Sequence, residues 1–123
     1  MGAAAPLQEA AVTALNLPSV YYQELQTEYT RKRDLFCGYL DDADLSYVKP
    51  QGAYYVLVDV SDFQATDDTT FCHYLAKEIG GAAVPGSSFF HEPVNHLIRF
   101  HFAKNDDILI EAGQRLGRIK ALV

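Results

Sequence analysis

The chain has 123 residues, of which 49% are hydrophobic and 12% aromatic, enough for one domain with a sizeable core. Its net charge of −6 has the wrong sign for binding nucleic acid or an anionic membrane surface, and its one basic cluster, residues 31–33, is typical of a solvated helix face. Without an apolar run of roughly 20 residues or a signal-peptide pattern, the sequence predicts a cytoplasmic globular protein.

Two helices are predicted in the first third of the chain. Residues 5–15 are rich in alanine and favour a helix, which must end before Pro18 because the residue preceding a proline avoids helical dihedral angles. Ser19 can cap a second, longer helix over residues 19–43. Its apolar positions with helical spacing are Tyr22, Leu25, Tyr29, Phe36 and Leu40.

Five further elements are predicted from residue types and periodicity. They are strands over residues 53–60, 82–84 and 96–102 and helices over residues 67–79 and 105–122. Gly80 and Gly81 can supply a left-handed cap for the first of these helices, and Asn105 can cap the second. The order of elements predicts an α+β fold, a two-layer small domain. A short, mainly antiparallel sheet of about three strands packs there with a long N-terminal helix and two further helices.

Arg99 stands among apolar residues in the last predicted strand. Because side chains alternate along a strand, Ile98 and Phe100 lie on one face, the core face, and Arg99 lies on the other. A guanidinium held by a stiff strand suits a two-pronged grip on a carboxylate, with charged hydrogen bonds of about 1.5–3 kcal/mol each. An internal ion pair with Asp59 or Glu92 is the alternative, and the pattern alone leaves both open.

Other chemistry-bearing residues favour structural roles. Cys37 and Cys72 lie far apart and match no metal-binding or redox spacing, so we expect buried free thiols. The spacing of His91, His96 and His101 does not resemble a metal cluster, and we expect these histidines at the surface. The stretch GSSFF lacks the second glycine of a nucleophile elbow, which argues against a hydrolase. We therefore expect no metal site.

Four stretches follow one another along the chain: KPQGAYYVLVDVSDF, FCHYLAKEIGGAAVPGSSFF, LIRFHFAKNDDIL and AGQRLGRI. In this order and spacing they resemble the C-terminal part of the class I/II aminotransferases, the fold-type I enzymes that use pyridoxal 5′-phosphate (PLP). The resemblance extends from about Pro6 to Val123 and is closest to the branch of kynurenine, methionine and aromatic transaminases. It implies that residues 19–123 form the small C-terminal domain. Residues 1–18 would hold an added start and a short leading helix that matches the end of the large domain.

The resemblance also implies roles for particular residues. Arg99 would bind the α-carboxylate of the amino acid or 2-oxo acid substrate, and Gly52, Ser88 and Phe89 would shape the substrate pocket near its mouth. Glycine at position 52 allows a close backbone approach that a side chain would block. The chain lacks the lysine motif that forms the Schiff base with PLP. We therefore expect no catalytic or cofactor-binding residue in it, and no activity from this fragment alone.

The hypothesis has two alternatives. The chain could be a free-standing, non-catalytic module that binds small carboxylates or dimerises through its long second helix. It could also belong to a related PLP-dependent β-lyase, because such enzymes share the fold and the carboxylate clamp. In the favoured hypothesis, the missing large PLP-binding domain precedes this segment, and the parent enzyme is a homodimer.

Overall fold

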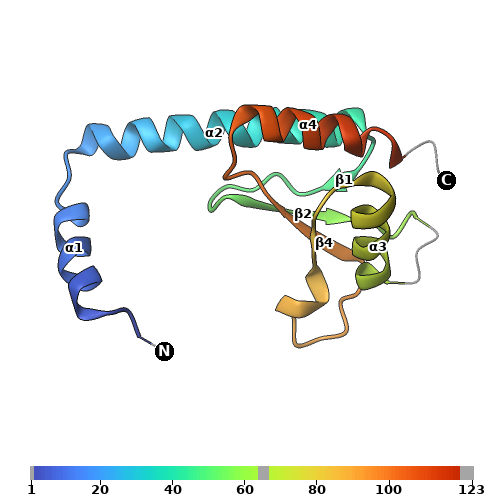
Figure 1. The fold of residues 1–123 in the computed structure, drawn as a ribbon, viewed down its shortest axis with the longest axis horizontal. Helices are drawn as coiled ribbons and strands as arrows, with labels where there is room; N and C mark the ends of the chain where they lie inside the picture. The colour runs from blue at the N-terminus through green and yellow to red at the C-terminus, as the bar shows by residue number, and fades with distance from the viewer. Residues whose placement is uncertain (1, 64–66, 120–123) are drawn as a thin grey trace.

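The computed structural model describes residues 2–63 and 67–119, and it confirms the predicted α+β class (Figure 1). The elements in chain order are α1 (Ala5–Leu15), α2 (Ser19–Asp42), β1 (Ser46–Tyr47), β2 (Tyr55–Asp59), α3 (Asp68–Tyr74), the π-helical turn η1 (Leu75–Ile79), β3 (Val84–Pro85), the 3-10 turn η2 (Gly86–Phe89), β4 (Leu97–His101) and α4 (Asp106–Leu116). None of the helices in the described part combines the length and the hydropathy that a membrane crossing requires.

The sheet is antiparallel, with the strand order β1-β2-β4-β3. It therefore contains one strand more than the approximate three that the sequence predicts. The additional strand, β1, has only two residues, too few to show any periodicity, and it forms because Ser46 and Tyr47 pair with the end of β2. As an interior strand, β4 is hydrogen-bonded on both sides, to β2 and to β3. The backbone of β4 is thus restrained from both sides, as is that of the other interior strand, β2.

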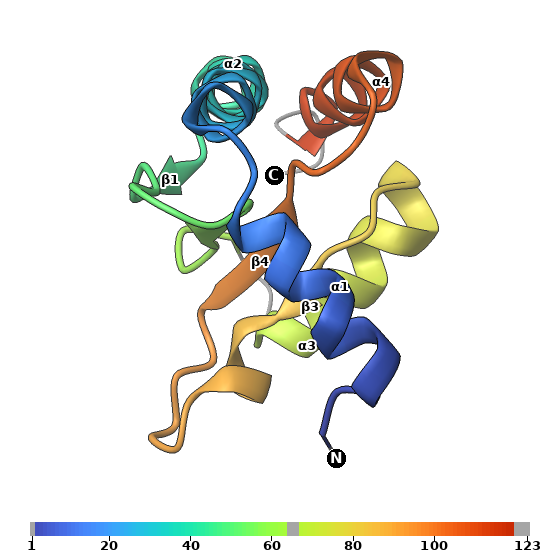
Figure 2. The ribbon, with the colours of Figure 1, turned by 90° about the vertical axis from the view of Figure 1, so that its left-hand side faces the viewer.

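Two helices cover one face of this sheet. In Figures 1 and 2, α2 and α4 lie side by side above the strands, while α3 packs against β3 and β4. The core residues between these elements include Phe36, Leu40, Val56, Val58, Phe71, Leu75, Ile98, Phe100, Phe102, Leu109 and Leu116. The predicted core face of the last strand is confirmed, because Ile98 and Phe100 are both buried. By contrast, α1 has no buried residue.

The predicted helix ends agree with the structure only in part. Gly80 takes the left-handed conformation, with φ of 74°, as predicted for a helix C-cap. Ser19 is not a cap: Pro18 holds the extended cap position, and Ser19 is already helical. Asn105 does occupy the cap position of α4, but its side chain makes no capping hydrogen bond. The predicted closing helix extends to residue 122, whereas α4 ends at Leu116, and residues 120–122 lie outside the described residues.

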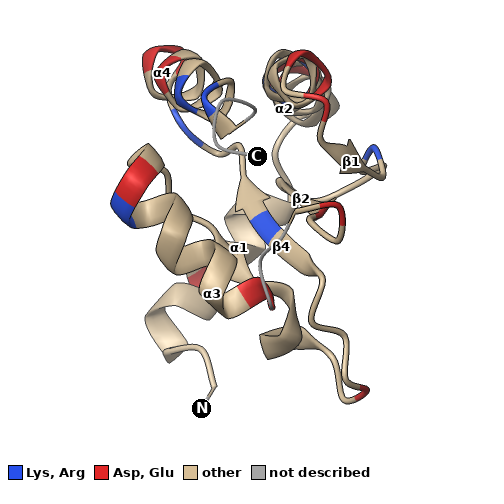
Figure 3. Cartoon of the chain, turned by 90° about the vertical axis from the view of Figure 1, so that its right-hand side faces the viewer, with Lys and Arg blue, Asp and Glu red and all other residues tan. Residues whose placement is uncertain are grey.

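An ion-pair network joins α2 to α4. The Arg31 guanidinium donates to both carboxylate oxygens of Asp106, each at 2.9 Å, and to Glu28 one turn earlier. In the view of Figure 3, Lys and Arg segments are spread over several elements and lie among Asp and Glu segments. The basic cluster that includes Arg31 is therefore more than the solvated face expected from the sequence, because it ties two helices together.

Acidification tests this network. Hydrogen bonds from Arg31 hold the pKa of Glu28 and of Asp106 below their usual values. A carboxyl with a lowered folded-state pKa stabilises the fold above its unfolded pKa, and this contribution is lost as pH falls through the folded pKa. We expect the Tm of wild-type protein, measured by circular dichroism, to fall more between about pH 6 and about pH 3 than the Tm of Asp106→Asn.

The control is Asp107→Asn, in the same first turn of α4. Asp107 is exposed and forms no ion pair with a described residue, so this variant should keep the wild-type pH profile. Because the Arg31 network is exposed, high salt should reduce the difference between Asp106→Asn and wild type. Identical pH profiles for the two variants would contradict a role for Asp106.

Candidate functional site

Arg99 lies at the middle of β4, on the face of the sheet opposite the core. Its neighbours in register are Leu57 on β2 and Val84 on β3. The adjacent residues Ile98 and Phe100 point into the core, so alternation turns the half-buried Arg99 side chain to the other face. The backbone of this arginine is thereby fixed from both sides, as a precise binding residue requires.

Two aromatic rings hold the guanidinium of Arg99. Its Cζ atom lies 3.8 Å from the ring centroid of Phe89 and 4.7 Å from the ring centroid of Tyr55. Cation–π attraction of about 0.5–1 kcal/mol for each exposed contact favours this position. The rings accept no conventional hydrogen bond, and no described residue accepts one from the N–H donors of the Arg99 side chain. These donors are thus available for binding.

No carboxylate among residues 2–63 and 67–119 forms an ion pair with Arg99. Neither internal partner that the sequence left open is used. Asp59 instead accepts a hydrogen bond from the backbone N–H of Ser61 at 2.9 Å, and hydrogen bonding with Ser61 lowers the pKa of Asp59. Glu92 is exposed and makes no such pair. The charge of Arg99 therefore has aromatic neighbours but no acid from the described part of its own chain.

The turn η2 brings Phe89 to Arg99. Gly86, the first residue of η2, is buried against β4, and a Cβ atom there would lie 2.5 Å from the carbonyl oxygen of Leu97. Phe89 remains 48% exposed, so part of its ring is available beside the guanidinium. Ser88 is also exposed, but it forms no hydrogen bond with Arg99. Of the two η2 residues expected near the substrate, the structure brings Phe89 into contact with Arg99.

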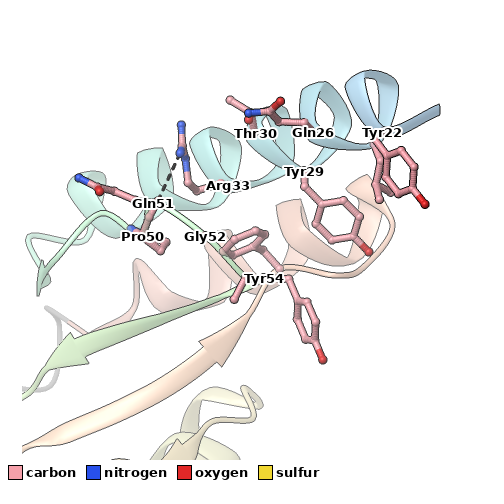
Figure 4. A pocket seen from close by; sticks show the side chains of 12 residues that line it. Tyr22, Gln26, Tyr29, Thr30, Arg33, Pro50, Gln51, Gly52 and Tyr54 are labelled. Carbon is pink, nitrogen blue, oxygen red and sulfur yellow. Dashed lines mark hydrogen bonds between the residues drawn. The ribbon is translucent and has the colours of Figure 1, made fainter. Parts of the chain in front are cut away.

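A cavity of about 490 Å³ lies between the first half of α2 and the turn that precedes β2 (Figure 4). Its lining residues are Tyr22, Leu25, Gln26, Tyr29, Thr30, Arg33, Pro50, Gln51, Gly52, Ala53, Tyr54 and Phe102. A Cβ atom at Gly52 would meet no other atom within 4 Å, so no described neighbour in this chain requires a glycine there. The next residue, Ala53, has a φ of 60°, which is strained for a residue with a side chain.

The cavity and Arg99 are neighbouring but separate features. Arg99 does not line the cavity; the two are linked by Tyr54, whose ring centroid lies 5.3 Å from that of Tyr55. The cavity contains Arg33, but this arginine already pairs with Asp34 at 2.9 Å. Of the two arginines, Arg99 is a better candidate than Arg33 for binding an anion, because the charge of Arg99 has no acidic partner among the described residues.

Tyr55 is the member of this site that the sequence did not reveal. The run AYYVLVDV predicts a strand but does not say which residue of another strand each tyrosine will face. The observed register places Leu57 opposite Arg99, so Tyr55 lies diagonally across on the same face. Once the pairing of β2 with β4 is known, the alternation of side chains identifies Tyr55 as a neighbour of Arg99.

The remaining nucleophilic groups are unsuited to catalysis. Cys37 and Cys72 are free and buried, as predicted. Burial raises the pKa of the Cys37 thiol and raises that of Cys72 to about 11. Both thiols are therefore protonated near neutral pH, which makes them weak nucleophiles. The histidines expected at the surface, His91, His96 and His101, are exposed.

The described lysines do not fit a PLP site. Lys32, Lys49 and Lys77 each lie within ion-pair distance of a neighbouring acid, at 3.4, 2.8 and 3.6 Å. Lys104 lines a smaller hollow of about 230 Å³ beside α4, and Arg99 does not line it. Lys120 lies outside the described residues. No described lysine is therefore placed with Arg99 to form a Schiff base, and no catalytic step can be assigned through PLP to these residues.

Comparison with known proteins identifies the family. The model of the family described as aminotransferase class I and II matches residues 2–114. The chain is 36% identical over 115 residues to the methionine aminotransferase of Escherichia coli, covering 93% of this chain and 30% of that protein. It is 33% identical over 137 residues to the kynurenine–oxoglutarate transaminase of Dictyostelium discoideum, covering 94% and 32%.

Solved structures give the same result. The crystal structure of the Escherichia coli methionine aminotransferase superposes with a TM-score of 0.81 at 36% identity, covering 92% of this chain and 30% of that one. An aromatic aminotransferase from Pyrococcus horikoshii also gives 0.81, at 31% identity, covering 94% and 32%. The chain belongs to the aminotransferase class I and II family. It spans about 30% of the full length of the relatives named above.

Proposed function

We propose that this chain is the small C-terminal domain of a PLP-dependent aminotransferase and that Arg99 binds the α-carboxylate of its amino acid and 2-oxo acid substrates. One observation carries the proposal. The Arg99 guanidinium is fixed between Phe89 and Tyr55 on the interior strand β4, and no described carboxylate pairs with it. Its planar fork can make two parallel N–H···O bonds to a carboxylate, which gives orientation as well as affinity.

In this proposal the arginine orients the substrate and exchanges no proton. Two hydrogen bonds fix the carboxylate plane, and the α-carbon attached to it is thereby held in one place, which lowers the entropic cost of reaching the transition state. Phe89 adds an exposed apolar surface beside the carboxylate. Ser88 and Gly52 would lie at the rim of the substrate pocket, where the missing side chain of Gly52 would leave room for a close approach.

The proposal assigns residues 19–123 to the small domain and residues 1–18 to the end of the large PLP-binding domain. Its support is the distribution of exposed apolar side chains, many of which lie on α1, on the connection that follows it and on the first half of α2. They are Leu7, Val12, Leu15, Leu17, Val20, Tyr21, Tyr22 and Leu25. A large domain packed against these residues would cover them. In keeping with the family resemblance, the full-length enzyme is proposed to be a cytoplasmic homodimer.

Removing the carboxylate from the substrate tests the proposal. In the full-length enzyme, kcat/KM for L-methionine is compared with kcat/KM for 3-(methylthio)propylamine, which lacks only the α-carboxylate. We expect the amino acid to be favoured by roughly 10²-fold or more, because two charged hydrogen bonds are lost with the amine. An amine that reacts as fast as the amino acid would rule out the carboxylate clamp.

The same enzyme preparation separates the alternatives. Amino transfer to a 2-oxo acid and β-elimination are assayed side by side, because both activities can share a carboxylate clamp. Elimination without amino transfer would identify a β-lyase. Absence of both activities from the complete polypeptide would favour a non-catalytic carboxylate-binding module.

A further inference from the structure

Asp68 is the one buried charged residue in the described part of the chain, with only 1% of its surface exposed. Its Oδ2 atom accepts a hydrogen bond from the backbone N–H of Ser87 at 2.7 Å. Its own backbone N–H donates to the carbonyl oxygen of Asn95 at 2.9 Å. Both bonds reach the segment between β3 and β4, which is the segment that contains Phe89. The first residue of α3 is thus tied to both ends of this segment.

A buried carboxylate is costly unless strong hydrogen bonds compensate it. The bond to Ser87 is of the charge-assisted kind, about twice as strong as a neutral one. The preceding residue, Asp67, caps α3 by accepting from the N–H of Thr70, so Asp68 is not needed as the cap. The bond made by the Asp68 side chain therefore acts on η2 and not on its own helix.

We propose that Asp68 is a positioning residue that holds Phe89 over the guanidinium of Arg99. This inference rests on the proposed function, since it explains how the edge of the Arg99 guanidinium is aimed at a substrate carboxylate. The contact distance of 3.8 Å between Arg99 Cζ and the Phe89 ring centroid is the geometry that Asp68 maintains.

Two consecutive anchors make the turn rigid. Gly86 is in close contact with the backbone of β4 at Leu97, and the next residue, Ser87, is held by Asp68 from the side of α3. With both anchors, η2 cannot rotate about its contact with β4, so the Phe89 ring stays in place. Without the Asp68 carboxylate, Gly86 alone would hold the turn, and the exposed Phe89 ring could move away from Arg99.

Nuclear magnetic resonance on the 123-residue chain tests the positioning directly. With its centroid 3.8 Å from Arg99 Cζ, the Phe89 ring should shift the side-chain protons of Arg99 upfield. The Phe89→Leu variant gives the reference shifts of these protons without the ring. We expect Asp68→Ala to remove most of this upfield shift while the amide shifts of β4 stay native. Asp68→Asn should keep most of it, because the amide oxygen can still accept from Ser87. The control Asp67→Asn should change nothing, since Asn caps helices as well as Asp.

A second measurement covers the case in which Asp68→Ala does not fold. In Asp68→Asn, a weaker neutral hydrogen bond replaces the charge-assisted one, so hydrogen exchange of the Ser87 amide should speed up by roughly tenfold. Asp67→Asn should leave this exchange rate unchanged. An unchanged Ser87 exchange rate in Asp68→Asn would overturn the proposal. A folded Asp68→Ala chain that keeps the wild-type Arg99 shift would overturn it as well.

Kinetics of the full-length enzyme distinguish this inference from the proposed function. Asp68→Ala should raise KM for the amino acid by roughly tenfold with a smaller change in kcat, and Asp68→Asn should restore most of the loss. In an Arg99→Ala background, Asp68→Ala should have no further effect on KM. A normal KM in Asp68→Ala beside a defective Arg99→Ala enzyme would reject the inference alone. An Arg99→Ala enzyme with normal kinetics would reject the proposed function.

Discussion

Replacing Arg99 by alanine in the full-length enzyme is expected to lower kcat/KM for the amino acid by roughly 10²–10⁴-fold. The variant loses two charged hydrogen bonds to the substrate carboxylate, which together are worth about 3–6 kcal/mol. Lysine at this position keeps the charge but not the planar fork, so Arg99→Lys should lie between alanine and wild type. The measurement is steady-state kinetics of amino transfer at several concentrations of the amino acid.

Two controls make this result specific. Arg118, near the end of α4, is exposed, and Arg118→Ala should leave kcat/KM unchanged. With the substrate amine that lacks a carboxylate, Arg99→Ala and wild type should react at similar rates, because the partner of the arginine is already absent. A loss of rate that is equally large for the amine would mean that the substitution damages the fold and not the carboxylate contact.

Much of the fold follows from local patterns in the sequence. The alternation around Arg99 predicts a core face at Ile98 and Phe100, and both are buried. Gly80 is predicted as a left-handed cap because glycine has no Cβ penalty there. The strand β1 could not be predicted, since two residues carry no period. The prediction that Ser19 caps α2 was wrong, because Pro18 with its extended dihedral angles holds the cap position and Ser19 is already helical.

The candidate site depends more on long-range pairing. The sequence identifies the face of Arg99 but not its contacts across the sheet. The register of β2 with β4 places both Tyr55 and Asp59 diagonally across from Arg99. Tyr55 contacts the guanidinium, whereas Asp59 accepts a hydrogen bond from the backbone N–H of Ser61. From the sequence alone, Asp68 is indistinguishable from any other acidic residue at the start of a helix. It is buried because η2 and the segment before β4 pack around it. Such contacts join segments distant in sequence, so periodicity does not reveal them.

Substituting alanine for Gly86 is expected to lower the free energy of unfolding of the 123-residue chain by about 3 kcal/mol, because overpacking of a tight contact costs this much. The new Cβ atom would lie 2.5 Å from the carbonyl oxygen of Leu97 and 2.9 Å from its Cβ atom. A backbone oxygen cannot rotate away as a flexible side chain can. The adjacent pairing of Pro85 with Ile98 holds β3 against β4, so relief of the clash requires the two strands to separate. Urea denaturation followed by circular dichroism measures the change.

Gly52→Ala is the matched control for this prediction, because it adds the same methyl group at a position where no atom lies within 4 Å. Its free energy of unfolding should stay within about 1 kcal/mol of wild type, since a loop glycine that becomes alanine mainly restricts the unfolded chain. Equal destabilisation by both substitutions would show that the contact of Gly86 with Leu97 does not limit the packing of β3 on β4. If the contact is limiting, Gly86→Ala should also weaken the Phe89–Arg99 contact, because η2 begins at Gly86 and would move with it.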